Sequence, residues 1–152
     1  MNADPEAAPV QVEPRVRPHP RRTRELDETR ALELLGRTGV GRVVYTVGAL
    51  PAVLPVRFRL DALGGVLLST AADSELARAV DGAVIAFEAD EVDGTDGTGW
   101  CVTVLGRAEL REPSATPSPS PSVSPSSAAG ARVEIRIAPE LVVGRDLMPD
   151  PS

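Results

Sequence analysis

The stretch VGRVVYTVGALPAVLPVRFRLDALGGVLLST, residues 40–70, contains three apolar runs rich in β-branched residues, separated by two turn sequences. Runs of this length bounded by Gly and Pro are typical of β-strands. Residues 48–51 and 61–65 supply the turns. Short loops between consecutive strands predict an antiparallel meander. We therefore expect three strands, over 40–47, 52–60 and 66–70.

The second of these strands has one apolar face. Side chains alternate between the two faces of a strand, so every second residue shares a face. Arg57 and Arg59 lie on the polar face. We expect the opposite face to meet the core, and we expect Arg59 to be an arginine exposed to solvent. The apolar face consists of Ala52, Leu54, Val56, Phe58 and Leu60.

The sequence on both sides of this stretch predicts two short helices and three further strands. Asp27 can cap the first helix, and Ser74 or Asp73 can cap the second. Gly106 indicates a bend inside a long strand. Six strands without a regular alternation of strand and helix predict a mainly β fold, with an antiparallel sheet closed into a small barrel. The further strands are expected over 83–89, 99–112 and 131–138.

Two segments lack the apolar residues that a core requires. Residues 1–25 are rich in Pro and Arg, and residues 113–130 are mostly Pro and Ser. Such compositions are typical of disordered chain. We expect a disordered tail over 1–25, one folded domain over 26–147 with a disordered insert at 113–130, and a short tail over 148–152.

Composition excludes several classes of function. All 16 cationic residues are arginine, which excludes mechanisms that need a lysine, and the net charge of −6 disfavours broad nucleic-acid binding. One cysteine, Cys101, excludes a disulfide framework. No apolar run approaches the ~20 residues of a membrane-spanning helix. We expect a cytoplasmic protein that binds neither nucleic acid nor membrane.

The order of the segments resembles that of the pyridoxamine 5'-phosphate oxidase-like superfamily of flavin-binding split β-barrels. The segments are GVGRVVYT, LPAVLPVRFRLD, GVLLSTAADSELARAV, AVIAFEAD, TGWCVTVLGRAEL and RVEIRIAPELVVGRDL. The resemblance covers about 26–112 and 131–147, and it points to the small single-domain, nitroimidazole-reductase-like branch. It implies a six-stranded antiparallel split barrel with two short helices, which forms a homodimer and binds FMN between its subunits.

The resemblance also implies where the FMN phosphate is held. It places four residues there: Arg57 on the second strand, Ser69 and Thr70 at the end of the third, and Ser74 at the start of the following helix. Hydroxyls, a guanidinium and the free N–H groups of a helix start suit a dianion.

One position departs from the pattern of similar proteins. Glu75 stands where they have Lys or Arg, and a carboxylate beside a phosphate is unfavourable. Arg78, one helical turn further on, can reach back and substitute. The strand that begins near Trp100 passes the isoalloxazine ring in similar proteins, so Trp100 is expected to contact the flavin.

No side chain qualifies as a catalytic acid, base or nucleophile. Cys101 has no histidine near it in sequence to activate it, and His19 lies in the Pro/Arg-rich tail. The acidic residues between 88 and 96 lack the spacing of an EF-hand, so we expect a solvated loop and no metal site.

The sequence thus leads to a dimeric FMN-binding protein, an oxidoreductase that acts on a small molecule. Two alternatives remain open: a reductase that uses the deazaflavin F420, and a module that binds or stores a cofactor without turnover. Glu75 is the feature that favours the last alternative.

Overall fold

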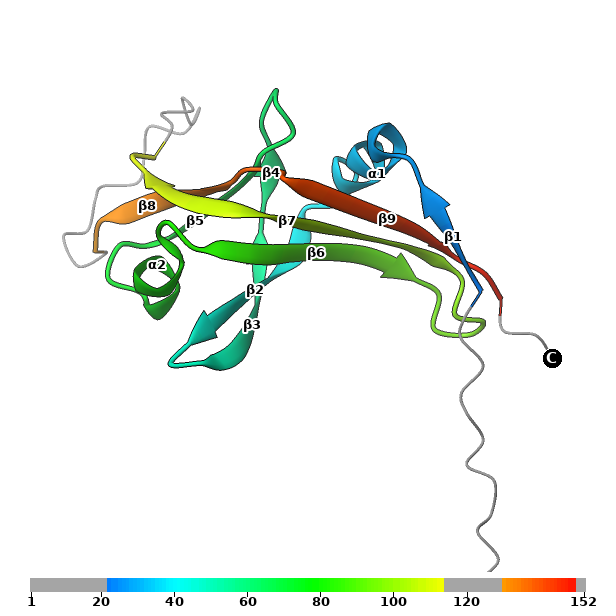
Figure 1. Cartoon of the computed structure of the whole chain (residues 1–152), viewed down its shortest axis with the longest axis horizontal. Coiled ribbons are helices and arrows are strands. Elements are labelled where there is room, and N and C mark those ends of the chain that lie inside the picture. Colours follow the sequence, from blue (N-terminus) through cyan, green and yellow to red (C-terminus); the bar gives the residue numbers. More distant parts are fainter. Residues whose placement is uncertain (1–21, 114–129, 150–152) are drawn as a thin grey trace, which may run out of the picture.

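The structure, a computed structural model, describes residues 22–113 and 130–149. Figure 1 shows a fold made mostly of strands, with α1 beside β9 at one end and α2 beside β5 and β8 at the other. In chain order the elements are β1 Thr23–Leu26, α1 Glu28–Leu35, β2 Val40–Val47, β3 Leu50–Arg57, β4 Arg59–Leu60, β5 Val66–Ala71, α2 Glu75–Val80, β6 Val84–Val92, β7 Gly99–Arg111, β8 Arg132–Ile137 and β9 Leu141–Leu147.

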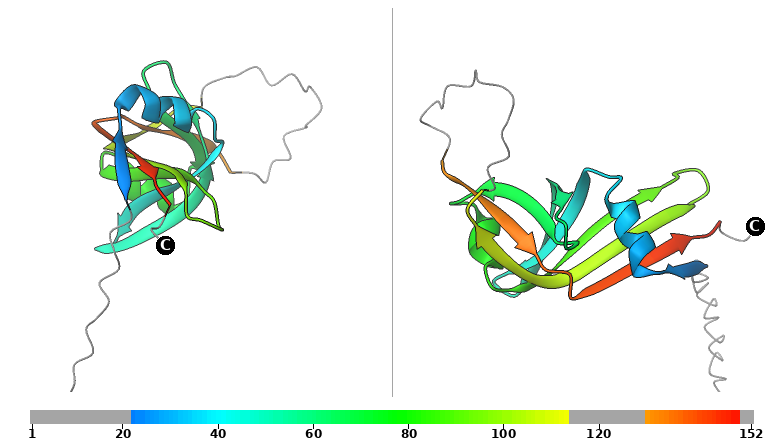
Figure 2. Two further views of the ribbon diagram at one scale, coloured as in Figure 1. Left: turned by 90° about the vertical axis from the view of Figure 1, so that its right-hand side faces the viewer. Right: turned by 90° about the horizontal axis from the view of Figure 1, so that it is seen from above.

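All strand pairs are antiparallel, and they form one nine-stranded sheet with the order β3-β2-β6-β7-β8-β5-β4, while β9 pairs with β7 and β1. Figure 2 shows this sheet curled into a half-barrel. The mainly β, antiparallel split-barrel fold with two helices is confirmed. The residues that the structure describes form nine strands instead of the six expected.

Two of the additional strands lie near the chain ends and pair with each other. β1 pairs with β9 from Thr23↔Leu147 to Leu26↔Gly144. Residues 23–25 were expected in the disordered tail, because they lack an apolar pattern. Main-chain hydrogen bonds to β9 hold β1 in place, and these bonds do not require an apolar pattern. The rest of the expected tail and most of the insert lie outside the described residues.

The strand expected over 52–60 is divided at Phe58. β3 pairs with β2 along its full length, whereas β4 pairs with β5. The Phe58 N–H donates to the Gly39 carbonyl at 3.1 Å. The chain therefore changes partner here, and the expected meander is corrected: β5 pairs with β4 and β8 and does not pair with β3.

Gly106 marks the corresponding change of partner in β7. Residues up to Leu105 pair with β9, and residues from Ala108 pair with β8. A Cβ atom on Gly106 would lie 1.5 Å from the Ala138 carbonyl oxygen. The close approach of two chain segments at this bend requires glycine, as the sequence indicated.

The core fills the inner face of the curled sheet. Phe87, Val43 and Val104 are fully buried there, and α1 packs on this face through Ala31, whose Cβ lies 2.8 Å from the position of a Cβ on Gly144. The other face of β1, β2, β3, β6, β7 and β9, called the outer face below, is turned away from the core. No helix formed by residues 22–113 or 130–149 is long and apolar enough to cross a membrane.

Candidate functional site

A notch opens on the surface where the chain turns from β3 into β4. β4 covers β5 only at Val66 and Leu67, so the next residues of β5 face the gap that Arg57 and Phe58 border. The notch has a volume of about 220 Å³. It is lined by Arg57, Phe58, Arg59, Leu67, Leu68, Ser69 and Glu134.

The two arginines of the notch differ in their surroundings. The Arg59 Nη2 lies 2.7 Å from Oε2 of Glu134, which is only 7% exposed. A buried carboxylate requires such a partner, so Arg59, which is exposed as expected, also serves as the counter-ion of Glu134. Arg57 is exposed and has no ion pair or side-chain hydrogen bond to any residue within the described ranges. Arg57 is thus the cation of the notch that remains available to a ligand.

Ser69 joins Arg57 at the notch and is held by β8. Its hydroxyl accepts a hydrogen bond from Arg132 Nε at 2.9 Å, and its carbonyl accepts one from Arg132 Nη2 at 3.2 Å. β8 brings Arg132 and Glu134 to this edge because Ser69 lies opposite Glu134 in the β5–β8 register. The notch therefore combines two guanidinium groups with one buried carboxylate, and Arg132 holds its Ser69 in place.

Thr70 and Ser74 form a separate group on the other side of β5. Successive residues of a strand point to opposite faces, so Ser69 and Thr70 diverge. The Thr70 hydroxyl donates to Ser74 Oγ at 3.1 Å, and Ser74 Oγ accepts from the Ala77 N–H at 3.1 Å as the N-cap of α2. The structure thus divides the expected phosphate cradle into two groups.

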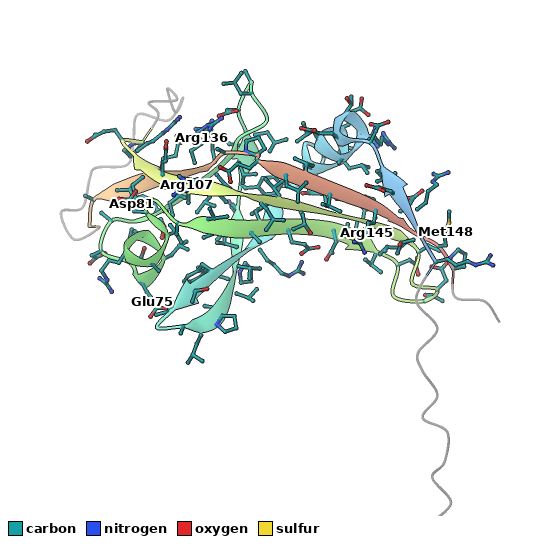
Figure 3. The ribbon with its side chains drawn as sticks, viewed as in Figure 1. Glu75, Asp81, Arg107, Arg136, Arg145 and Met148 are labelled. Atoms are coloured by element: carbon teal, nitrogen blue, oxygen red, sulfur yellow. The ribbon has the colours of Figure 1, made fainter. Side chains whose placement is uncertain are left out.

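Arg78 reaches back toward the start of α2, as the sequence suggested. Its Nη1 donates to the Asp73 carbonyl at 2.6 Å. Glu75 is exposed on the outside of α2 (Figure 3). The α2 helix has only six residues, so its dipole is small, and its capping hydroxyl is already engaged.

Trp100 lies away from both groups. It packs against the core on the inner face, while Arg57 is on the outer face and three strands away in the sheet order. Within one chain, Trp100 and the notch do not come together. The expected role of Trp100 at a flavin stays a prediction.

Cys101 follows Trp100 and points to the outer face. It lies opposite Asp90 on β6 and Arg145 on β9. Burial raises the pKa of its thiol, and the negative charge of Glu88 raises that pKa further. A thiol with a raised pKa is a poor nucleophile at neutral pH, which agrees with the inert role expected from the sequence.

The acidic loop after β6 makes hydrogen bonds with its own backbone. Asp93 accepts from the N–H of Thr95 at 2.7 Å, and Asp96 accepts from the N–H of Thr98 at 2.9 Å. Among residues 22–113 and 130–149, no group of three His, Cys, Asp or Glu residues could hold a metal ion.

The sequence did not identify Glu134 as a residue of the notch or Arg132 as the partner of Ser69. The alternation of charged and apolar residues in 131–138 showed that both face away from the core. That β8 lies beside β5 follows only from the pairing order.

Comparisons with known proteins agree with this architecture. The sequence model of the pyridoxamine 5'-phosphate oxidase family matches residues 27–145. The uncharacterized protein Rv0080 of Mycobacterium tuberculosis is 34% identical over 138 residues, which cover 83% of this chain and 86% of that protein.

Solved structures share the fold. The FAD binding protein from Mycobacterium smegmatis matches with a TM-score of 0.65 and 27% identity, over 84% of this chain and 100% of that one. A FAD-binding protein from Mesorhizobium loti matches with a TM-score of 0.62, over 83% of this chain and 99% of that one; at 18% identity, that likeness concerns the fold alone.

Proposed function

The chain belongs to the pyridoxamine 5'-phosphate oxidase family, and on this basis we propose that it is a flavoprotein that binds FMN at the notch. The observation that carries the proposal is the exposed Arg57 guanidinium, which has no partner among the described residues and borders the notch. Similarity to a protein described as FAD-binding supports a flavin as the ligand.

The residues of the notch fit a flavin phosphate. Arg57 would hold the phosphate by charge-assisted hydrogen bonds, and the Ser69 hydroxyl would add a further contact. Phe58 and Leu67 supply apolar walls beside these polar groups. Sites for small molecules combine apolar walls with a few polar groups in this way.

The size of the notch supports a site shared by two subunits. Its volume of about 220 Å³ is below the ~300–1,000 Å³ of typical ligand pockets. We therefore propose a cytoplasmic homodimer in which a second chain closes the site.

When bound, FMN would supply hydride or electron transfer to a small-molecule substrate. The chain itself would hold the phosphate and exclude water from the flavin. We assign no general acid or base, because the thiol of Cys101 has a raised pKa and Cys101 is not among the residues that line the notch.

Absorption spectra of protein reconstituted with FMN, FAD, riboflavin or F420 test the proposal. We expect a yellow complex, with FMN bound more tightly than riboflavin because only FMN has the phosphate. If FAD or F420 binds more tightly than FMN, that molecule is the cofactor in place of FMN. A protein that binds none of the four contradicts the proposal.

Replacing Arg57 tests where the phosphate lies. A charge-assisted hydrogen bond contributes ~1.5–3 kcal/mol, so Arg57→Ala should weaken FMN binding by roughly 10- to 150-fold. Riboflavin binding should change little. Arg37→Ala, which removes an exposed arginine from the loop after α1, is the matched control. An equal loss of riboflavin affinity would place the phosphate elsewhere.

A further inference from the structure

Ser69 and Arg57 both line the notch, and the register of β4 and β5 explains why. In that register Arg59 lies opposite Leu67. Arg57 precedes Arg59 by two residues. Ser69 follows Leu67 by two residues, and since the strands are antiparallel it lies on the same side of this pair as Arg57. A ligand group that Arg57 binds therefore meets the Ser69 hydroxyl as well.

A residue of β8 already uses a lone pair of the Ser69 hydroxyl. A serine hydroxyl has one hydrogen to donate and two lone pairs that accept. Arg132 Nε donates to Ser69 Oγ at 2.9 Å. A guanidinium has no acceptor, so the serine hydrogen cannot be donated back to Arg132. Residues 22–113 and 130–149 provide no acceptor for this hydrogen, which leaves it available to a ligand.

Arg132 holds Ser69 by two hydrogen bonds, one to the side chain and one to the main chain. Its Nη2 donates to the Ser69 carbonyl at 3.2 Å, next to the bond from Nε. Ser69 lies opposite Glu134, and Arg132 is two residues from Glu134 on β8, so it reaches Ser69 along the diagonal of the ladder. The planar guanidinium makes both bonds in a rigid fork, which a lysine ammonium does not have. Arg132 therefore fixes the direction from which the Ser69 hydroxyl accepts.

We infer that Arg132 is a positioning residue, which makes the Ser69 hydroxyl a hydrogen-bond donor toward the ligand of the notch. Arg57 has only N–H groups to offer, and the Glu134 carboxylate is bound by Arg59. Arg57 and Ser69 then both donate to the ligand. Two such donors suit a phosphate dianion, whose oxygens only accept. The inference rests on the proposed function, the binding of FMN at the notch.

Three replacements of Arg132 separate the effect of the hydrogen bond from the effect of the charge. Arg132→Gln places an amide nitrogen as many bonds from Cα as Nε is, so it keeps a donor for Ser69 Oγ and loses the charge. The Ser69 carbonyl beside Oγ favours the orientation in which the amide turns its NH₂ group to Ser69. Arg132→Lys keeps the charge without the fork, and Arg132→Met has neither.

FMN titrations of these variants should follow the hydrogen bond. Arg132→Gln should stay within about twofold of wild type, because an exposed charge contributes little. Arg132→Lys and Arg132→Met should bind FMN roughly 4- to 12-fold more weakly, the value of one ordinary hydrogen bond. Riboflavin, which has no phosphate, should bind all four proteins alike. If Arg132→Lys binds FMN more tightly than Arg132→Gln, Arg132 acts through its charge and the inference is wrong.

A double-mutant cycle decides whether Arg132 acts through Ser69. In a chain that already contains Ser69→Ala, Arg132→Met should not weaken FMN binding further, because the hydroxyl that it positions is absent. Ser69→Thr keeps a hydroxyl and should keep the dependence on Arg132. A full additional loss in the Ser69→Ala chain would show that Arg132 binds the phosphate itself, which overturns the positioning role.

Arg111→Met is the matched control. Arg111 is an exposed arginine of β7, opposite Glu134, and it makes no hydrogen bond to Ser69. This change removes a guanidinium from the same part of the sheet and should alter FMN affinity by less than about twofold. A loss as large as that of Arg132→Met would show a general effect of surface charge and would overturn the inference.

The wild-type protein separates failure of this inference from failure of the proposed function. A wild-type chain that binds FMN no more tightly than riboflavin overturns the proposed phosphate site and this inference with it. A wild-type preference for FMN that Arg132→Met leaves unchanged overturns the role of Arg132 alone. Thermal unfolding of each variant shows that it is folded, and a loss of riboflavin affinity equal to the loss of FMN affinity would contradict a role at the phosphate.

Discussion

At the scale of single residues, Arg57 and Arg59 show how one buried carboxylate separates two neighbouring arginines. Both lie on the polar face that the sequence indicated, but of the two only Arg59 forms an ion pair with Glu134. Glu134→Gln removes the charge and keeps the shape of the side chain. We expect a loss of ~1–3 kcal/mol in the free energy of unfolding, because the charged hydrogen bond between Arg59 and the buried Glu134 is lost.

The same change should tighten FMN binding, because Arg59 becomes available to the phosphate. Urea unfolding and FMN titration measure the two effects. Glu33→Gln, which breaks the exposed ion pair with Arg30, should cost less than ~1 kcal/mol. Equal losses of unfolding free energy for the two variants would show that the ion pair of the buried Glu134 stabilises the fold no more than an exposed ion pair does.

Asp61 gives a prediction about pH. Its carboxylate accepts from Arg136 Nε at 2.6 Å and from the N–H groups of Leu63 and Gly65. The hydrogen bond from Arg136 is the largest cause that holds the pKa of Asp61 below its usual range. Because this pKa is lower in the folded state, the stabilisation is present above the unfolded pKa, ~3.9, and is lost as pH falls through the folded value.

Asp61→Asn keeps an oxygen for the turn and removes the ion pair. We expect a lower melting temperature than wild type at pH 7, and a smaller difference between the two proteins near pH 3. Thermal unfolding at both pH values measures this. A difference that stays constant with pH would show that the charge of Asp61 does not contribute.

At the scale of an element, β7 depends on a single glycine. Gly106 lies where β7 passes from β9 to β8, with the Ala138 carbonyl in the space of a Cβ. Gly106→Ala forces the backbone apart, and we expect a loss of more than ~2 kcal/mol in the free energy of unfolding. Gly39→Ala, where nothing lies within 4 Å of the added Cβ, should change it by less than ~0.5 kcal/mol. Denaturant unfolding of both variants checks the bend.

At the scale of the whole molecule, β7 and β8 pair directly with each other on the two sides of the insert. Arg111 lies opposite Glu134 at the end of this antiparallel pair, so a short hairpin loop can join the two strands. Replacing residues 114–129 by a few Gly and Ser residues should leave the melting temperature within a few degrees of wild type. A large drop in thermal unfolding experiments would show that the insert stabilises the fold.

The sequence alone determined the mainly β fold, the cap of the first helix and the bend at Gly106, and it limited the second cap to Asp73 or Ser74, because strand alternation, capping side chains and glycine act over a few residues. β2 and α1 begin and end close to where local patterns place them. The assignment of Arg57 and Ser69 to one site came only from the resemblance to the family. The fold class, the helix caps and the bend depend on residues that are close together in the sequence, so the sequence is enough to predict them.

Only the tertiary structure decided which strands meet. The pairing of β5 with β8 brings Glu134 to Arg59, and the pairing of β1 with β9 orders residues that have no apolar pattern. The pairing of β5 with β8 also brings Arg132 to Ser69, whereas the divergence of Ser69 and Thr70 follows from the alternation of side chains along β5. Strand pairing joins residues far apart in sequence through main-chain groups that every residue has, so the side-chain pattern does not specify it.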